Sequence, residues 1–178
     1  GHLILKYGDE HNLKKIGVTH GGHPIPDKNC VEGCRTIIRK IKEYKLSSRD
    51  LMFTLIGNGT SSLLTLPPDD LSLEDVAQVT KIMQIEKGIP TPSVNIVRNQ
   101  IDQLKGGRIT RLIHPAKMIH IFPIDLNEPN ALGIGGYDGL VYSNFWLHTL
   151  PDISTPEGAV EVLHKYELWD RMPPSICK

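Results

Sequence analysis

The apolar residues of this chain follow two alternating spacings, one typical of buried strands and the other of amphipathic helices. The run from Leu51 to Ile56 is almost unbroken in its hydrophobicity, which is typical of a strand buried on both faces of a parallel sheet. A second strand is predicted over 118–124, and shorter β-type runs occupy 3–6 and 16–19. At least four strands are therefore expected.

Four other segments show the spacing of apolar residues that is typical of helices. The first follows Asp27, a favourable N-cap residue, and the second opens at Ser72, which forms a capping-box pattern with Asp75. The third begins after Pro90, and the last begins at Thr155. Strands that alternate with helices predict an α/β protein, here a three-layer α/β/α sandwich with a mostly parallel, Rossmann-like sheet.

Length and charge narrow the class of protein further. The chain has 178 residues, which fits a single domain, and its 20 basic residues balance its 20 acidic ones. This balance gives no reason to expect nucleic acid or a membrane surface as a partner. No apolar run reaches the length of a membrane span, and the first residues do not have the pattern of a signal peptide. A cytoplasmic protein is expected.

The three cysteines indicate reduced thiols rather than a disulfide framework. Cys30 and Cys34 lie one helical turn apart, which favours packing on the inner face of a helix. The alternative is a metal site that these two residues share with His20 or His23.

The loop at 57–61 comes directly after the first long strand and immediately before a predicted helix start. This order directs several backbone N–H groups towards one anion, because the first turn of a helix leaves its N–H groups unpaired. The loop residues are Gly57, Asn58, Gly59, Thr60 and Ser61. Their pattern matches neither the dinucleotide fingerprint nor the phosphate loop, so glycines that serve the turn geometry alone remain the alternative.

A second candidate for anion binding is the segment Lys105, Gly106, Gly107, Arg108, which follows Asn95 and Arg98 on the preceding helix. Arginine holds phosphate or carboxylate oxygens through forked hydrogen bonds, and glycines let backbone N–H groups approach the same anion. The alternative is a helix that ends at a glycine, with Lys105 and Arg108 exposed to solvent.

Asp125 follows the second long strand, where ligand sites of α/β sheets gather, although a turn residue would occupy the same position. No pair of histidines has the spacing of a metal motif, so most of them are interpreted as structural. His120 is expected to be a half-buried histidine with a hydrogen-bond partner, and His23 is the histidine to mutate first.

Taken together and in order, five segments resemble the type II glycerate kinases, a family long labelled hydroxypyruvate reductase. The segments are 23–27, 50–64, 95–98, 105–108 and 151–155. The resemblance implies that the chain is part of the N-terminal α/β domain of that family. The N-terminal segment and the C-terminal domain of the family would then lie outside it.

The resemblance further implies ATP- and Mg²⁺-dependent transfer of a phosphoryl group to a hydroxyl of glycerate or a related small hydroxy acid, and we also expect a homodimer. Lys105, Arg108 and Asp125 would be catalytic, and Asp125 would also hold the metal. The residues that would bind substrate or nucleotide are Gly57, Asn58, Gly59, Thr60, Ser61, Asn95, Arg98, Gly106 and Gly107. The alternatives are an NAD(P)-dependent hydroxypyruvate reductase and a non-catalytic module that binds small anions or nucleotides.

The chain departs from the family pattern at three places. Thr60 replaces a glycine, so a backbone cradle requires that Thr60 has a negative φ. Asp102 replaces a serine and could pair with Arg98 or bind a metal. The proline and glycine that should follow Asp125 are missing, which implies a changed substrate.

Overall fold

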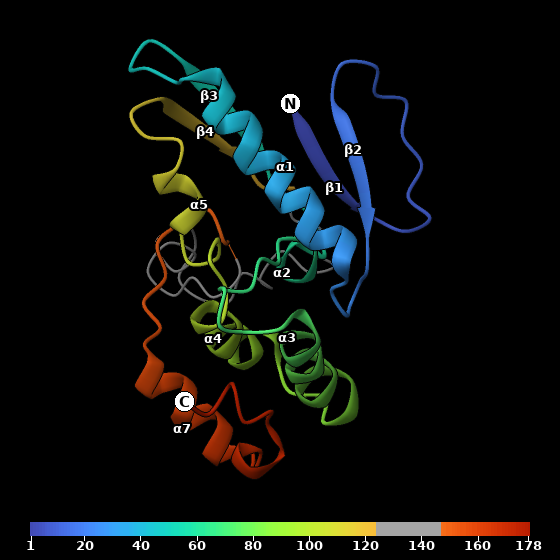
Figure 1. The fold of residues 1–178 in the computed structure, drawn as a ribbon, viewed down its shortest axis with the longest axis vertical. Coiled ribbons are helices and arrows are strands. Elements are labelled where there is room, and N and C mark those ends of the chain that lie inside the picture. Colours follow the sequence, from blue (N-terminus) through green and yellow to red (C-terminus); the bar gives the residue numbers. More distant parts are fainter. Residues whose placement is uncertain (124–146) are drawn as a thin grey trace, which may run out of the picture.

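The computed structural model describes residues 1–123 and 147–178, in which strands and helices alternate as expected for an α/β protein (Figure 1). The strands and α1 lie at one end of the molecule, and α3, α4 and α7 lie at the other. The elements are β1 (His2–Lys6), β2 (Gly17–Gly21), α1 (Lys28–Tyr44), β3 (Leu51–Leu55), α2 (Thr60–Leu63), α3 (Leu73–Thr80), the π-helix η1 (Lys81–Glu86), α4 (Thr91–Gln100), α5 (Arg108–Arg111), β4 (Lys117–Ile121), α7 (Pro156–Lys165) and the 3₁₀-helix η2 (Trp169–Arg171).

The four described strands pair two by two, and both pairs are parallel, as the sequence predicted. β1 runs beside β2, with His2 opposite Gly17, and β3 runs beside β4, with Leu51 opposite Lys117. Among the residues that the structure describes, these strands form two sheets of two strands rather than one sheet. Helix α1 packs against β1 and β2, and its Ile41 belongs to a cluster that also reaches β3 and β4. One helix therefore contacts both pairs.

The structure corrects the expectation that β3 is buried on both faces. The side chains of Leu51, Phe53 and Leu55 are 51%, 60% and 55% exposed, whereas the residues between them are half-buried. On β4, Ile119 and Ile121 are also exposed. An unbroken apolar run has no periodicity, so it predicts a strand without showing whether its second face is covered.

The predicted helix starts are confirmed. The carboxylate of Asp27 accepts hydrogen bonds from the backbone N–H groups of the first turn of α1, and Ser72 Oγ accepts one from Asp75 N at 3.0 Å. Cys30 and Cys34 are buried on the inner face of α1, as the packing interpretation predicted. Burial raises the pKa of the Cys34 thiol to about 12, so this thiol stays protonated.

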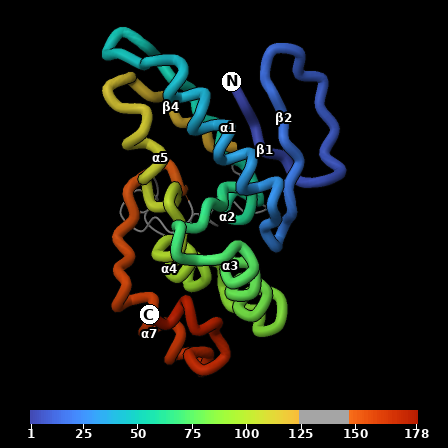
Figure 2. Tube along the Cα trace, viewed as in Figure 1, coloured from blue at the N-terminus to red at the C-terminus, as the bar shows by residue number. Residues whose placement is uncertain are grey.

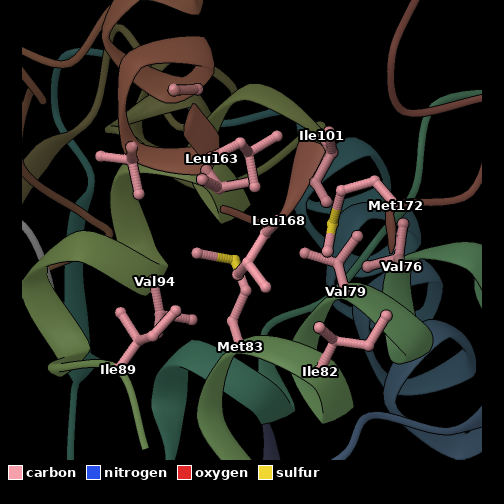
Figure 3. Packing of buried hydrophobic residues seen from close by; sticks show 13 residues of the cluster. Val76, Val79, Ile82, Met83, Ile89, Val94, Ile101, Leu163, Leu168 and Met172 are labelled. Carbon is pink, nitrogen blue, oxygen red and sulfur yellow. The ribbon is translucent and has the colours of Figure 1, made fainter. Parts of the chain in front are cut away.

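The largest hydrophobic cluster joins α3, η1, α4 and α7 (Figure 3). Val79 and Met83 meet Val94 of α4 and Leu163 of α7 in its interior. This packing fixes the rotation of α4, so that a second, polar face of that helix is directed towards the loop after β3. Figure 2 shows the N-terminus at the strand end of the molecule and the C-terminus at the helical end. None of the described helices is long and apolar enough to cross a membrane.

Candidate functional site

The loop after β3 and the turn after β2 lie against each other. Ser62 Oγ donates a hydrogen bond to the Gly22 carbonyl at 3.1 Å, and a Cβ atom placed on Gly59 would lie 3.0 Å from His23 Cδ2. Both segments follow the carboxyl ends of parallel strands, where ligand sites of α/β folds gather. The turn that contains His23, which the sequence singled out, therefore lies beside the predicted glycine loop.

Gly59 and Thr60 of the glycine loop have different backbone conformations. Gly59 adopts a φ of +87°, and α2 begins at Thr60. Thr60 does not have a positive φ, and its Oγ1 donates to the Gly57 carbonyl at 2.5 Å. The β-branched side chain thus occupies the position without forcing the backbone into the left-handed region. The condition placed on Thr60 from the sequence is met.

Asn95 of α4 reaches this loop, and Arg98 on the same helix contacts Asn95. The Arg98 Nη1 group donates to Asn95 Oδ1 at 3.3 Å, and Asn95 Nδ2 donates to Ser61 Oγ at 3.0 Å. Their spacing of three residues places both side chains on one face of the helix. The structure therefore brings together three residues that the sequence predicted from separate segments.

The guanidinium of Arg98 is buried without a carboxylate partner in the part of the chain that the structure describes. The residue is only 4% exposed, and two further donors contact Thr80 Oγ1 at 3.2 Å and Gln84 Oε1 at 2.8 Å. Burial lowers the pKa of Arg98 to about 10, which leaves it charged at neutral pH. A buried charge is costly unless an opposite charge compensates it, so this position favours an anionic ligand.

Asp102 pairs with Lys105 rather than with Arg98. Lys105 Nζ lies 2.7 Å from Asp102 Oδ2, and both side chains are at most 2% exposed. The same ammonium donates to the carbonyl of Leu64 and to Thr65 Oγ1, so its three N–H groups all have acceptors. The proposed contact of Lys105 with an anionic oxygen remains a prediction, and it requires the ammonium to exchange one of these partners.

The paired glycines allow a second segment of backbone to approach closely. Gly106 and Gly107 have φ values of +63° and +78°. A Cβ atom on Gly107 would lie 3.0 Å from the carbonyl atoms of Leu150, and Gly107 N donates to the His148 carbonyl at 3.0 Å. The N–H group of Gly107 is therefore occupied by protein rather than free to hold an anion. The alternative of a solvent-exposed Lys105 is also wrong, because that residue is 1% exposed.

Arg108 is half-buried and retains unused hydrogen-bonding capacity. One of its terminal N–H groups donates to the Asn99 carbonyl, while its Nε atom is buried and has no hydrogen-bond partner among the residues that the structure describes. Asn99 Oδ1 and Thr149 Oγ1 are also buried, and no described residue forms a hydrogen bond with either atom. Arg108 thus remains able to donate to a ligand.

His148 is the site residue that sequence reasoning missed, because it was interpreted as one of several structural histidines. It is 1% exposed, and its Nε2 atom lies 2.8 Å from Ser61 Oγ. Burial holds the pKa of His148 well below its usual value, and the charges of Lys105, Arg98 and Arg108 lower it further. These three cations therefore lie close enough to His148 to affect its charge state. Their convergence on an anionic ligand remains a prediction.

Two residues that the sequence predicted for the site do not lie among the buried groups described above. Asp125, the predicted metal ligand, lies outside the described residues. Asn58 is exposed at the tip of the loop. His120, by contrast, is half-buried and paired with Thr54 Oγ1 through Nδ1 at 2.7 Å, as the alternation in its strand predicted.

The fold and the site define an α/β protein with a cluster of buried cations beside a glycine loop. The chain belongs to the family described as "Domain of unknown function (DUF4147)", whose pattern matches residues 1–135. It is 30% identical to the glycerate 2-kinase of Pyrococcus horikoshii over 99% of its own length and 37% of that protein. It is 31% identical to the D-glycerate 2-kinase of Thermotoga maritima over 93% of its own length and 37% of that protein. The resemblance to the glycerate kinases is confirmed.

Two solved structures are similar to this chain in both fold and sequence. A crystal structure of a Pyrococcus horikoshii protein superimposes with a TM-score of 0.76 at 30% identity and covers 99% of this chain. A glycerate kinase of Thermotoga maritima superimposes with a TM-score of 0.75 at 29% identity. A relative from Agrobacterium vitis, 29% identical, bears the name putative hydroxypyruvate reductase. The chain spans 37% and 39% of the two solved structures, so it corresponds to only part of these proteins.

Proposed function

We propose that this protein transfers a phosphoryl group from ATP to a hydroxyl of glycerate or a related small hydroxy acid. The observation that carries the proposal is the buried guanidinium of Arg98, which is linked through Asn95 to the glycine loop and has no carboxylate partner among the described residues. The names of the similar kinases from Pyrococcus horikoshii and Thermotoga maritima support the same assignment.

The chemistry requires positioned positive charge more than a covalent catalyst. In phosphoryl transfer the negative charge spreads over the phosphoryl oxygens, and fixed cations stabilise it. Arg98 and Arg108 would hold anionic oxygens of substrate or nucleotide, and Lys105 would do the same once its ammonium exchanges one of its present partners. The backbone of 57–61 would surround a second anionic group.

In this proposal Asp125 holds Mg²⁺ or accepts the proton of the substrate hydroxyl. The described ranges 1–123 and 147–178 contain no group of three metal-ligating His, Cys, Asp or Glu side chains. Mg²⁺ is commonly bound by one or two carboxylates together with substrate phosphates and water. When bound, the ion would neutralise phosphate charge during transfer.

We also propose the domain organisation, the cellular location and the oligomeric state that the sequence led us to expect. The 178 residues would form one α/β domain, to which the family adds an N-terminal segment and a C-terminal domain. The protein would act in the cytoplasm as a homodimer.

The test is to incubate the full-length protein with ATP, Mg²⁺ and D-glycerate. ADP and a phosphorylated glycerate are expected, and chelation of Mg²⁺ should abolish their formation. Arg98→Met should lower kcat/KM roughly 10- to 150-fold, because a charged hydrogen bond contributes about 1.5–3 kcal/mol. The matched control Arg111→Met removes an exposed arginine of α5 and should leave the rate unchanged.

Two results would contradict the proposal. Oxidation of NADH that depends on hydroxypyruvate, without release of ADP, would identify a reductase. Binding of nucleotide or glycerate with neither reaction would identify a binding module without turnover.

A further inference from the structure

The turn between β2 and α1 carries His23 and is held in place on both sides of it. Before His23, the Gly22 carbonyl accepts hydrogen bonds from Ser62 Oγ at 3.1 Å and from Cys30 Sγ at 3.5 Å. After His23, the carboxylate of Asp27 accepts a hydrogen bond from Cys30 N at 3.1 Å. The backbone of His23 is therefore anchored both to the start of α1 and to α2, which follows the glycine loop.

The imidazole of His23 lies against the glycine loop at Gly59. A Cβ atom on Gly59 would lie 3.0 Å from His23 Cδ2 and 3.3 Å from His23 Nε2. These distances are shorter than an ordinary contact of a Cβ atom, so a glycine at this position leaves room for the ring. One side of the imidazole is thus placed at the same loop that Asn95 reaches through Ser61.

The ring nitrogens of His23 are not used by the protein. Neither nitrogen has a hydrogen-bond partner among the residues that the structure describes. By contrast, His20 Nε2 lies 3.0 Å from the Asp9 carbonyl oxygen, and His148 Nε2 lies 2.8 Å from Ser61 Oγ. His23 is also exposed, so its ring can be reached from solvent. A neutral His23 therefore offers one acceptor nitrogen and one N–H donor to a ligand.

The surroundings of His23 keep its imidazole neutral. Partial burial lowers the pKa of His23, and the charges of Lys6 on β1 and Arg98 on α4 lower it further. Asp9, in the loop after β1, has the opposite and smallest effect. The glycine loop contains no titratable side chain. A neutral imidazole can accept a proton, and the two nearby cations disfavour the imidazolium, which promotes release of that proton to solvent.

We propose that His23 is a catalytic residue that accepts the proton of the attacking hydroxyl group of the substrate. In this step the hydroxyl oxygen forms a bond to the γ-phosphorus of ATP, while the bond from that phosphorus to the bridging oxygen breaks and its electron pair leaves with ADP. The hydroxyl proton passes to the acceptor nitrogen of His23 and then to solvent. This deepens the proposed function and rests on it, and it makes an imidazole rather than a carboxylate the proton acceptor.

The kinetic test uses the full-length protein with ATP, Mg²⁺ and D-glycerate. Its kcat/KM should fall as the pH is lowered through the pKa of His23, because an imidazolium cannot accept a proton. His23→Gln should lower kcat/KM about 10²–10⁴-fold and remove this acidic limb of the pH profile. His114→Gln, which removes another exposed histidine that precedes a proline, is the matched control and should change neither. An unchanged rate in His23→Gln, or an acidic limb that persists in it, would overturn the proposal.

Chemical rescue separates catalysis by His23 from packing against Gly59. His23→Ala removes the ring and leaves space for a small molecule beside the loop. Added imidazole should raise the rate of this variant, because it supplies a base of the same chemistry. It should not raise the rate of Arg98→Met, which lacks a charge rather than a base. A rate of His23→Ala that imidazole does not raise would assign a packing role to His23 and overturn the proposal.

The state of the ring is tested without turnover by nuclear magnetic resonance. Titration of the histidine ring protons in the full-length protein should show a neutral His23 at pH 7, and Lys6→Met should raise its pKa because a like charge is removed. A charged His23 at pH 7 would overturn the proposal. If the unsubstituted protein forms no ADP, the proposed function fails and the catalytic role of His23 fails with it. Full activity in His23→Gln would contradict the role of His23 alone.

Discussion

At the scale of single residues, the site depends on buried groups that are costly to place in the interior. Arg98 is 4% exposed and His148 is 1% exposed, and the two are joined through Asn95 and Ser61. Each is stabilised by hydrogen bonds, yet the positive charge of Arg98 has no carboxylate partner in the described ranges. We interpret this combination as a candidate ligand site, because apolar residues in the same place are often as stabilising as buried charges or more so.

Burial of His148 makes the stability of the protein depend on pH. The pKa of this imidazole is well below its usual value in the folded state, so the unfolded chain binds more protons below about pH 6.5. Stability contributed by the neutral imidazole is present above this pH and is lost as the pH falls. Between pH 7 and pH 5 the protein should lose about 1–2 kcal/mol more than a His148→Gln variant. Urea denaturation at each pH measures this difference, and parallel pH profiles for the two proteins would contradict the account.

Gly107 should tolerate a side chain less well than another glycine with a positive φ. A Cβ atom at Gly107 would lie 3.0 Å from backbone atoms of Leu150, whereas nothing lies within 4 Å of the same position at Gly88. Gly107→Ala is expected to cost about 2–5 kcal/mol, from the left-handed backbone and from overpacking. Gly88→Ala should cost only about 1–2 kcal/mol. Equal urea midpoints for the two variants would show that the close approach to Leu150 is unimportant.

Contacts between site residues that are close in the sequence could be predicted, whereas contacts between distant residues could not. Asn95 and Arg98 could be placed on one face from helical spacing alone. His148 could not be connected with Ser61, because 87 residues separate them and no local pattern marks such a contact. The sequence could not show that the N–H of Gly107 is occupied either, since its acceptor belongs to the same distant segment.

At the scale of elements, the buried pair of Lys105 and Asp102 joins the segment after α4 to the end of α2. Lys105 Nζ contacts the Leu64 carbonyl and Thr65, and Asp102 accepts from the backbone of Leu66 at 3.0 Å. This connection holds the predicted cation segment beneath the glycine loop. Sequence reasoning identified Asp102 as a departure but did not anticipate that its partner would be Lys105.

Removal of one partner of this pair should destabilise the protein more than removal of both. Lys105→Met leaves the Asp102 carboxylate buried without a cation, which costs about 3–5 kcal/mol. Adding Asp102→Asn should recover part of this loss, because the amide is neutral and its one oxygen can still accept the hydrogen bonds from the backbone N–H groups of Leu104 and Lys105. Urea denaturation of the two single variants and the double variant gives the coupling between the residues. Strict additivity would mean that the pair does not act as a unit.

The strands show how far an element can be predicted from its residues. The positions of β3 and β4 and their parallel pairing agree with the apolar runs. The exposure of one face of these strands was not predicted. Whether a strand is covered depends on distant segments of the chain that pack against it rather than on its own residues. The helices were predicted with their caps, since Asp27, Ser72 and Thr155 act on the backbone within three residues of themselves.

At the scale of the whole molecule, one apolar face of the β3–β4 pair is exposed. Phe53 lies opposite Ile119, and Leu55 lies opposite Ile121, and all four side chains are 44–60% exposed. Adjacent exposed apolar side chains of this kind promote association. This face belongs to a chain that spans only 37% of the relatives from Pyrococcus horikoshii and Thermotoga maritima.

The 178-residue chain is therefore expected to self-associate as its concentration rises. Phe53→Lys combined with Ile119→Lys should abolish this association, because it places two like charges on the apolar face. Leu112→Lys, which changes an exposed leucine at the end of α5 rather than on β3 or β4, should not. Light scattering after size-exclusion chromatography measures the mass. A monomer at all concentrations without any substitution would contradict this expectation.

The central claim is that the buried charge of Arg98, together with Arg108 and the loop at 57–61, holds a small anionic ligand. A crystal structure of the full-length protein with bound 2-phosphoglycerate tests it most directly. The account predicts an anionic oxygen within hydrogen-bond distance of the Arg98 or Arg108 guanidinium and a ligand group beside the loop. A ligand bound elsewhere, with Arg98 contacting only Thr80, Gln84 and Asn95, would contradict the claim.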